Sequence, residues 1–253
     1  MRAYPSQRLG RPPHPGRGHR NKKKGHKILR WLGKTSAIVA LVIVLLSFFI
    51  VLPIRWINPT TTAFMLQDTS DIQPLKHEWV TWGDMGDALP IAVVASEDQT
   101  FAVHMGFDVK SIRDSVDEYA KGQSLRGAST ITQQVAKNLY LWPGRSFLRK
   151  GIEAYLTALL EATLPKKRIL EIYLNVAEFG PGIYGAGAAS KSYFGKAPSL
   201  LEDDEAALLA AVLPSPKRLK IEQQTSYLQE RQSWIIEQME RLRREQWLLL
   251  LDQ

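Results

Sequence analysis

The chain has 253 residues, and its 33 basic and 25 acidic side chains give a formal charge of +8. Eleven of the basic residues lie within the first 35 positions, where no acidic residue occurs, so 22 basic residues remain against all 25 acidic ones. The net charge after position 35 is therefore −3, which excludes a strongly basic, nucleic-acid-binding face on the folded part. The sequence has no cysteine, so disulfide bonds and thiolate metal sites are excluded as well.

An uncharged apolar run of 20 residues follows the basic tail, between Lys34 and Arg55. At a rise of about 1.5 Å per residue, this run crosses a hydrocarbon core of roughly 30 Å. Trp31 and Trp56 flank it, and the excess of Lys and Arg lies on its N-terminal side. We expect a transmembrane helix over 35–55, with the N-terminus in the cytoplasm.

The alternative is a cleaved signal peptide, which also has a basic segment before an apolar one. The apolar run is longer than the usual signal sequence, and no small-x-small cleavage site follows it before Pro53. The tail over 1–34 is rich in Pro, Gly, Arg and Lys, so we expect it to be disordered. Its expected role is attraction to anionic lipid, at about 1 kcal/mol per basic residue, and binding of nucleic acid is the weaker alternative.

The rest of the chain is predicted to be mainly α-helical. A linker with little regular structure is expected over 56–75, because Pro and Thr are frequent there. Apolar residues at helical spacing predict helices over 89–97, 146–164, 165–174, 203–213 and 227–251, with Pro165 at a first helical position. The run Gly180 to Gly185 matches G-x-G-x-x-G, but a helix precedes it, so we interpret its glycines as turn residues.

Three passages combine acids, bases and amides in ways that packing alone does not require. In the first, an apolar helix ends at Glu97, and shielding of its carboxylate by Phe101 and Phe107 would raise its pKa and suit it to proton transfer. The alternative is a solvated acid at a helix end.

The second passage, 126–138, places Ser129 as the cap of a helix that carries Gln133, Gln134 and Lys137. A helix N-terminus with hydroxyl groups and a nearby lysine binds anions well. A plain capped surface helix explains the same residues.

In the third passage, Arg145, Arg149 and Glu153 are spaced four residues apart, and Lys150 precedes Glu153 by three. The alternatives are a cationic surface for phosphate and an exposed ladder of ion pairs, each worth only about 0.3 to 0.5 kcal/mol.

Four motifs occur in one order along the chain. They are E-D-x-x-F-x-x-H-x-G-x-D from Glu97 to Asp108, G-A-S-T-I-T-Q-Q from Gly127 to Gln134 followed by Lys137-Asn138, R-K-x-x-E from Arg149 to Glu153, and I-L-E-x-Y-L-N from Ile169 to Asn175. This set resembles the motifs of glycosyltransferase family 51, the peptidoglycan glycosyltransferases. The resemblance covers 76–216, which we predict to be the catalytic domain, with 217–253 as a C-terminal helical extension.

The resemblance implies a mainly α, lysozyme-like domain with one N-terminal transmembrane helix. It also implies that the enzyme polymerises lipid II into β-1,4 glycan strands, releases undecaprenyl pyrophosphate and inverts the configuration at C1 of the donor MurNAc. The enzyme would lie in the bacterial inner membrane with its catalytic domain in the periplasm. Its expected partners are lipid II, the growing glycan strand, the membrane and proteins of cell division or elongation, with no nucleic acid.

Residue roles carried over from the family are expectations. Glu97 matches the general base, and Glu153 matches a second acid near the donor pyrophosphate. Lys137 and Arg145 match residues that contact the pyrophosphate, and the supporting residues would be Ser129, Gln133, Gln134, Arg149 and Lys150. Asp98, Phe101, His104 and Gly106 are expected to shape the loop rather than bind a metal. No organic cofactor is expected, and a divalent Mg or Mn ion near the pyrophosphate is the one metal considered.

The sequence departs from the family pattern in few places. Ala128 stands where many members have a second glycine, and no S-x-x-K or K-T-G acylation signature is present. With few residues after 216, we expect no transpeptidase activity. Two other functions stay open: a lysozyme-like or lytic enzyme that cleaves glycan, and a non-enzymatic cell-wall scaffold. For an inverting enzyme, the Glu97 and Glu153 carboxylates should be further apart than the roughly 5 Å of a retaining pair.

Overall fold

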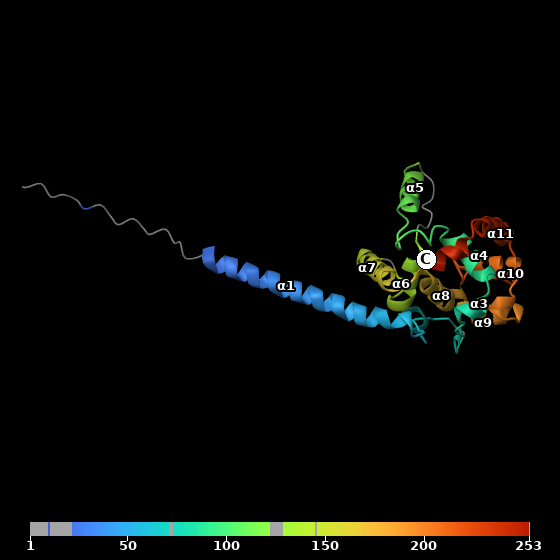
Figure 1. Cartoon of the computed structure of the whole chain (residues 1–253), viewed down its shortest axis with the longest axis horizontal. Helices are drawn as coiled ribbons and strands as arrows, with labels where there is room; N and C mark the ends of the chain where they lie inside the picture. The colour runs from blue at the N-terminus through green and yellow to red at the C-terminus, as the bar shows by residue number, and fades with distance from the viewer. Residues whose placement is uncertain (1–9, 11–21, 71–72, 122–128, 145, 253) are drawn as a thin grey trace, which may run out of the picture. The chain divides into compact units, whose positions relative to one another are not determined.

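The computed structural model describes residues 10, 22–70, 73–121, 129–144 and 146–252, and it divides into a unit over 1–48 and a unit over 49–253 (Figure 1). Of the predicted disordered tail, residues 1–9 and 11–21 lie outside this description. The 30-residue helix α1 (Lys22–Val51) begins 13 residues before the predicted start of the membrane helix. Residues 22–34 are thus helical rather than disordered, because Lys, Arg, Leu and Ile all tolerate a helix that continues beyond an apolar run.

Within α1 and the turn after it, residues Leu29–Arg55 are long and apolar enough to cross a membrane. The apolar side chains of this stretch are largely exposed, as Leu41, Leu45 and Phe49 illustrate. Water would disfavour so much exposed apolar surface, whereas lipid accepts it. The helix is consistent with a single membrane anchor.

The second unit is mainly α-helical. Its first half contains η1 (Leu52–Arg55), α2 (Ala63–Leu66), β1 (Lys76–His77), α3 (Trp82–Met85), α4 (Ala88–Glu97), α5 (Val109–Ala120), α6 (Ile131–Tyr140) and α7 (Phe147–Thr163). Its second half contains α8 (Lys166–Val176), β2 (Glu178–Gly180), β3 (Ile183–Tyr184), α9 (Gly185–Phe194), η2 (Pro198–Leu200), α10 (Asp203–Val212), α11 (Ser226–Arg244) and η3 (Trp247–Asp252).

Two groups of helices form the core of this unit. Helices α4, α10 and α11 pack against one another, and α6 packs against α7 and α8 (Figure 1). Helix α4 has no charged residue before Glu97, and its residues from Leu89 to Ala95 are all buried. Each large aliphatic side chain buried in this way stabilises the fold by about 1.5 to 3 kcal/mol. Glu97 is thus carried on a rigid, buried helix.

Three short strands form a sheet in the order β1-β3-β2, with β1 parallel and β2 antiparallel to β3. The glycine-rich run predicted to form a turn connects β2 to β3 and begins α9. Gly182 and Gly185 have φ angles of 66° and 82°, and a Cβ on Gly185 would lie 2.5 Å from the carbonyl oxygen of Asn175. The predicted turn chemistry of these glycines is confirmed.

Several predicted boundaries differ from the observed ones. The expected linker over 56–75 contains the one-turn helix α2, which Thr62 caps by accepting a hydrogen bond from the Met65 backbone N–H at 3.1 Å. Pro165 is the N-cap of α8 rather than its first residue. Helix α7 begins after its N-cap Ser146, whose hydroxyl accepts from the Arg149 N–H.

The C-terminal segment differs most from its prediction. The single helix expected over 227–251 ends at Arg244, because Gln246 adopts a φ of 51° and the chain turns into η3. Leu228, Ile235 and Met239 of α11 are buried in the same core as α4 and α10. Residues 217–252 therefore belong to the compact unit and do not form a separate extension.

Asn175 attaches the segment before α3 to α8. Its side-chain amide donates to the carbonyl oxygens of Val80 and Glu171, both at 2.9 Å, and its Oδ1 accepts from the Val80 N–H at 2.7 Å. The side chain has no exposed surface, so water cannot replace these bonds.

We predict that Asn175→Ala lowers the free energy of unfolding by at least about 2 kcal/mol, because it leaves both backbone groups of Val80 without partners. Thermal and denaturant unfolding of the full chain in detergent would measure this change. Gln229→Ala, at an exposed position of α11, is the control and should change the stability by less than about 0.5 kcal/mol. Equal stabilities for the two variants would contradict the role of Asn175.

Candidate active site

Glu97 is the last residue of α4, and its side chain is 12% exposed. Its Oε2 accepts a hydrogen bond from the Gln134 side-chain amide at 2.8 Å, and its Oε1 accepts one from the Ser96 hydroxyl at 3.5 Å. The Arg231 guanidinium lies 3.9 Å from Oε1. Burial raises the pKa of Glu97 above 4.5, while Gln134 and Arg231 oppose this shift. A carboxylate with a raised pKa is a stronger proton acceptor near neutral pH.

Gln134 is held in the orientation that Glu97 requires. The Tyr173 hydroxyl donates to the Gln134 Oε1 at 3.2 Å, so the amide nitrogen of Gln134 faces Glu97. Tyr173 is fully buried, and burial raises its pKa well above 10, so it remains a donor. The sequence predicted Gln134 as a supporting residue, but it did not predict Tyr173 as the residue that orients it.

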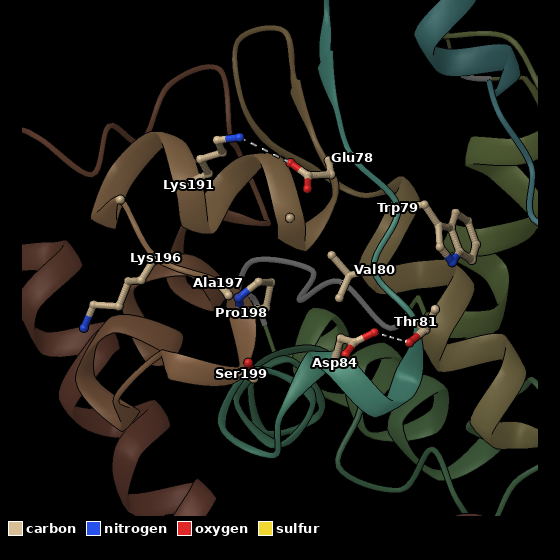
Figure 2. Close-up of a pocket in the computed structure, with 12 residues that line it drawn as sticks. Glu78, Trp79, Val80, Thr81, Asp84, Lys191, Lys196, Ala197, Pro198 and Ser199 are labelled. Atoms are coloured by element: carbon tan, nitrogen blue, oxygen red, sulfur yellow. Dashed lines mark hydrogen bonds and ion pairs between the residues drawn. The ribbon is translucent and has the colours of Figure 1, made fainter.

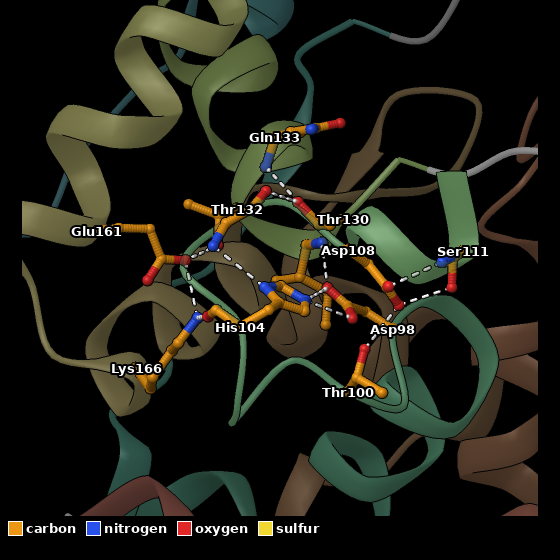
Figure 3. A network of polar contacts seen from close by, with 12 residues as sticks. Asp98, Thr100, His104, Asp108, Ser111, Thr130, Thr132, Gln133, Glu161 and Lys166 are labelled. Carbon is orange, nitrogen blue, oxygen red and sulfur yellow. Dashed lines mark hydrogen bonds and ion pairs between the residues drawn. The ribbon is translucent and has the colours of Figure 1, made fainter. Parts of the chain in front are cut away.

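Asp98 connects the end of α4 to the start of α6 (Figure 3). Its carboxylate accepts from the Ile131 backbone N–H at 3.0 Å and from Nε2 of His104 at 2.9 and 3.1 Å. Nδ1 of His104 accepts in turn from the Gly106 N–H at 3.1 Å, and the Gly106 carbonyl accepts from the Thr130 hydroxyl at 2.7 Å. These bonds hold the loop between Glu97 and Asp108 against α6, and they use both ring nitrogens of His104.

The cap of α6 differs from its prediction. Thr130, and not Ser129, is the N-cap, and its hydroxyl accepts from the Gln133 N–H at 3.2 Å. The helix begins at Ile131 because Asp98 binds that residue's N–H. Ser129 is exposed and lines the cavity beside Glu97.

Phe101 packs beneath the loop rather than serving mainly as a shield for Glu97. Its fully buried ring contacts His104 and Trp247, with ring centroids 6.3 and 6.4 Å apart, and the Lys166 ammonium lies 4.5 Å from its centre. Lys166 also pairs with Glu161 at 2.8 Å. The sequence analysis did not identify Lys166 or Glu161, since their other partners, the His104 carbonyl and the Thr132 hydroxyl, lie in distant segments.

Glu153 lies in a second charged cluster, on α7. Its Oε2 accepts from Arg149 at 3.0 Å, its Oε1 accepts from Lys150, and Lys150 also donates to the Gln133 Oε1 at 3.3 Å. The side chain of Glu153 is only 4% exposed, so this is a partly buried cluster and not the exposed ladder considered as an alternative. Arg145, the remaining predicted member, lies outside the described residues.

Lys137 of α6 interacts electrostatically with two charged clusters. The first is Glu97 with Arg231, and the second is Glu153 with Arg149 and Lys150. Lys137 is attracted to both Glu153 and Glu97 and repelled by Arg149 and Lys150, and burial lowers its pKa below 10.5. Its ammonium lies 5.3 Å from the centre of the Phe64 ring. Lys137, Arg149 and Lys150 together carry more positive charge than Glu153 neutralises, so this side of the site favours an anion.

Two cavities meet at the Glu97–Gln134 pair. The first, of about 310 Å³, is lined by Glu97 and Asp98 of the α4 end, by Ser129 and Thr130 before α6, and by Trp234 of α11. The second, of about 270 Å³, is lined by Gln134, Lys137, Tyr173 and Lys217 among others. A proton acceptor thus faces the first cavity, and a buried cation faces the second.

The described residues of this region present no ready-made metal site. Both carboxylate oxygens of Glu153 already accept from cations, and no group of three His, Cys, Asp or Glu side chains within the described ranges could hold an ion. A phosphate at the Glu153 cluster would be bound by cationic side chains.

Another cavity, of about 530 Å³, lies between the segment after β1, helix α9 and η2 (Figure 2). None of the predicted site residues lines it. Its charged groups have partners: Lys191 lies 3.9 Å from Glu78, and the Thr81 hydroxyl donates to Asp84 at 2.6 Å. We do not include it in the candidate active site.

Arg231 and Trp234 of α11 were missed by the sequence analysis. A signal was present, because Leu228, Ile235, Met239 and Leu242 follow a helical period that predicts a buried face. A helix that packs on α4 brings its neighbouring residues to Glu97.

Comparison with known proteins shows the family of the chain. The family model described as "Transglycosylase" matches residues 65–240, a range that includes both charged clusters and most of α11. The chain belongs to this family, and it is a glycosyltransferase.

Several curated proteins named biosynthetic peptidoglycan transglycosylase are similar to the chain. The one from Shewanella frigidimarina is 53% identical over 188 residues, which cover 74% of this chain and 82% of that protein. The one from Marinomonas sp. is 52% identical over 199 residues, covering 78% and 87% respectively. The one from Stutzerimonas stutzeri is 46% identical over 222 residues, covering 85% and 87%.

Gly106 provides a test of the loop geometry. Its φ is 78°, and a Cβ there would lie 2.6 Å from Cγ2 of Thr157. We predict that Gly106→Ala lowers the free energy of unfolding by about 1 to 3 kcal/mol from backbone strain alone. Gly151→Ala is the matched control: its Cβ meets nothing within 4 Å, and alanine should stabilise α7 by up to about 1 kcal/mol. Opposite shifts in thermal midpoint are expected, and a stable Gly106→Ala variant would contradict the geometry.

Proposed function

We propose that this enzyme polymerises lipid II into β-1,4 glycan strands and releases undecaprenyl pyrophosphate. The observation that carries the proposal is the placement of a buried carboxylate, Glu97, near a buried lysine, Lys137, that has Arg149 and Lys150 beside it. This pair matches a reaction that removes a proton from one substrate and releases a pyrophosphate from the other.

On the acceptor side, Glu97 would take the proton from the 4-hydroxyl group of the acceptor sugar. The oxygen then attacks C1 of the donor MurNAc on the face opposite the pyrophosphate, which inverts the configuration at that carbon. Gln134 donates a hydrogen bond to Glu97 and fixes the direction of its carboxylate. General-base catalysis of this kind contributes about 10² to 10⁴ in rate.

On the donor side, the bond from C1 to the pyrophosphate oxygen breaks, and the pyrophosphate leaves with both electrons. Lys137, Arg149 and Lys150 would stabilise its charge, and we keep Arg145 as a predicted member of this group. Glu153 orients Arg149 and Lys150 through the bonds described above. A leaving group that is already an anion requires positive charge more than a proton, so we assign no obligatory metal.

We further propose that α1 anchors the enzyme in the inner membrane, with the N-terminus in the cytoplasm and the catalytic domain in the periplasm. The 11 basic residues before the apolar run support this orientation. A substrate with a lipid tail is confined to the bilayer, so an anchored enzyme meets it at the surface. Proteins of cell division or elongation are proposed as partners.

The cationic cluster distinguishes this reaction from cleavage of glycan. A hydrolase acts on a glycosidic bond whose leaving oxygen requires a proton, and it gains nothing from two further cations, Arg149 and Lys150, beside the buried Lys137. The geometry therefore favours synthesis over lysis.

The first test is Glu97→Gln with labelled lipid II as substrate. We expect the wild type to form polymer and the variant to lose at least about 100-fold in rate, since the amide cannot accept the proton. The thermal midpoint should equal or exceed that of the wild type. Because burial raises the pKa of Glu97, the folded state loses stability as pH rises above 4.5 through the folded pKa, and glutamine removes this loss.

Glu230→Gln, at an exposed position of α11, is the control and should polymerise at the wild-type rate. Shortening of preformed glycan by the wild type, without polymer, would show the lytic alternative. Full cell-wall function of Glu97→Gln in cells would show the scaffold alternative.

The second test uses pH. Activity requires ionised Glu97, so the rate should fall as pH falls through its pKa. Arg231 lowers this pKa, so Arg231→Met should raise it and move the acidic limb of the pH–rate profile to higher pH. Arg241→Met is the control, because Arg241 lies on the same helix and bonds Gln99 instead. Identical acidic limbs for wild type and Arg231→Met would refute the coupling of Arg231 to Glu97.

A further inference from the structure

The cavity beside Glu97 has an aromatic side chain in its wall. Trp234 of α11 is 42% exposed, and it lines this 310 Å³ cavity together with Glu97. The other lining residues are mostly polar, and the charged ones are Asp98, Asp108, Lys110 and Asp114. An indole left open beside hydroxyl and carboxylate groups suits a ligand with one apolar face and a polar edge.

The position of Trp234 is fixed by its helix. Arg231 donates to the Ser96 hydroxyl at 3.0 Å, and the Gln99 side-chain amide donates to Gln238 at 3.5 Å. Ile235, the next residue after Trp234, is completely buried. Helix α11 is therefore joined to both ends of the turn that carries Glu97, and the indole is held in place before any ligand binds.

The charge of this cavity excludes the pyrophosphate end of the substrate. Four carboxylates and one lysine line it, and hydrogen bonds to Ser111 and Thr100 contribute to lowering the pKa of Asp108 to about 2, so that group is ionised. The cavity on the other side of Gln134 is lined by two lysines, Lys137 and Lys217, and by one carboxylate, Glu178. An anion is favoured in that second cavity, and an uncharged group is favoured beside Trp234.

An amino sugar in its N-acetylated form meets these requirements. A pyranose ring has a face of C–H groups, which packs on the negative face of an aromatic ring, and its hydroxyl and acetamido groups point sideways toward donors and acceptors. With one ring on Trp234, the ring's edge faces the hydroxyl and carboxylate groups of the cavity, Glu97 among them.

We propose that Trp234 is the stacking platform for the acceptor amino sugar and a specificity-determining residue for its binding. This inference rests on the proposed function, because it assigns the acceptor to the Glu97 side of the site. Arg231 acts through Ser96 and Glu97 and is a positioning residue.

The kinetic test compares Trp234→Ala and Trp234→Phe in the full chain with labelled lipid II. Trp234→Ala should raise KM about tenfold with kcat changed less than about twofold, and Trp234→Phe should remain within about twofold of wild type in both. Tyr227→Ala removes another exposed aromatic residue of α11 that does not line the cavity, and it should match the wild type. Wild-type KM in Trp234→Ala would overturn the proposal.

A binding test is independent of turnover. The seven tryptophans can be labelled with fluorotryptophan, and the ¹⁹F resonance absent from Trp234→Phe identifies Trp234. A β-1,4-linked tetramer of N-acetylglucosamine should shift that resonance, and the same shift should occur in Glu97→Gln. No shift in a wild type that polymerises lipid II would overturn the platform alone. A shift without any polymerisation would support the sugar site and refute the proposed function.

Discussion

The carboxylate of Asp98 is the constraint on which the site depends. It is buried, so its charge must be matched by hydrogen bonds, and it accepts them from the first N–H group of α6 and from His104. A helix N-terminus also favours a negative charge at this place. The residue before Asp98 is Glu97, and the fourth residue of α6 is Gln134. Joining the two helix ends therefore brings the Glu97 carboxylate to the Gln134 amide that donates to it, and it holds the intervening loop against α6.

Ionisable side chains near the contact between α4 and α6 are buried, and burial disfavours their charged forms. Burial raises the pKa of Glu97 and lowers that of Lys137. The charge of each residue partly opposes the shift in the pKa of the other. Such groups reduce stability, but they are better suited to proton transfer and to binding an anion that brings its own charge. Glu153 is also buried, and its single negative charge holds Arg149 and Lys150 close together. One positive charge of this pair remains without compensation by Glu153.

Helix α11 shows how function extends beyond the recognisable motifs. Its buried face packs on α4 and α10 for ordinary hydrophobic reasons, and its adjoining residues then lie at the cavity beside Glu97. Arg231 contributes charge, and Trp234 contributes an aromatic surface. The sequence did not place Arg231 and Trp234 beside Glu97, since helical periodicity shows that a face is buried but not which helix buries it.

The sequence alone determined the mainly helical fold, the apolar anchor helix, the turn at the glycines from Gly180 to Gly185, and the membership of a transglycosylase family through motifs of local spacing. These features depend on residues close together in the chain, so periodicity and motif order reveal them. Only the tertiary structure decided that Thr130 caps α6 and that Phe101 packs against Lys166 and Trp247. It also decided that Arg231 donates to the hydroxyl of Ser96, which is 135 residues earlier in the chain. Burial and electrostatic potential depend on neighbours that come from distant segments. The upward shift in the pKa of Glu97 therefore arises only once those segments have packed.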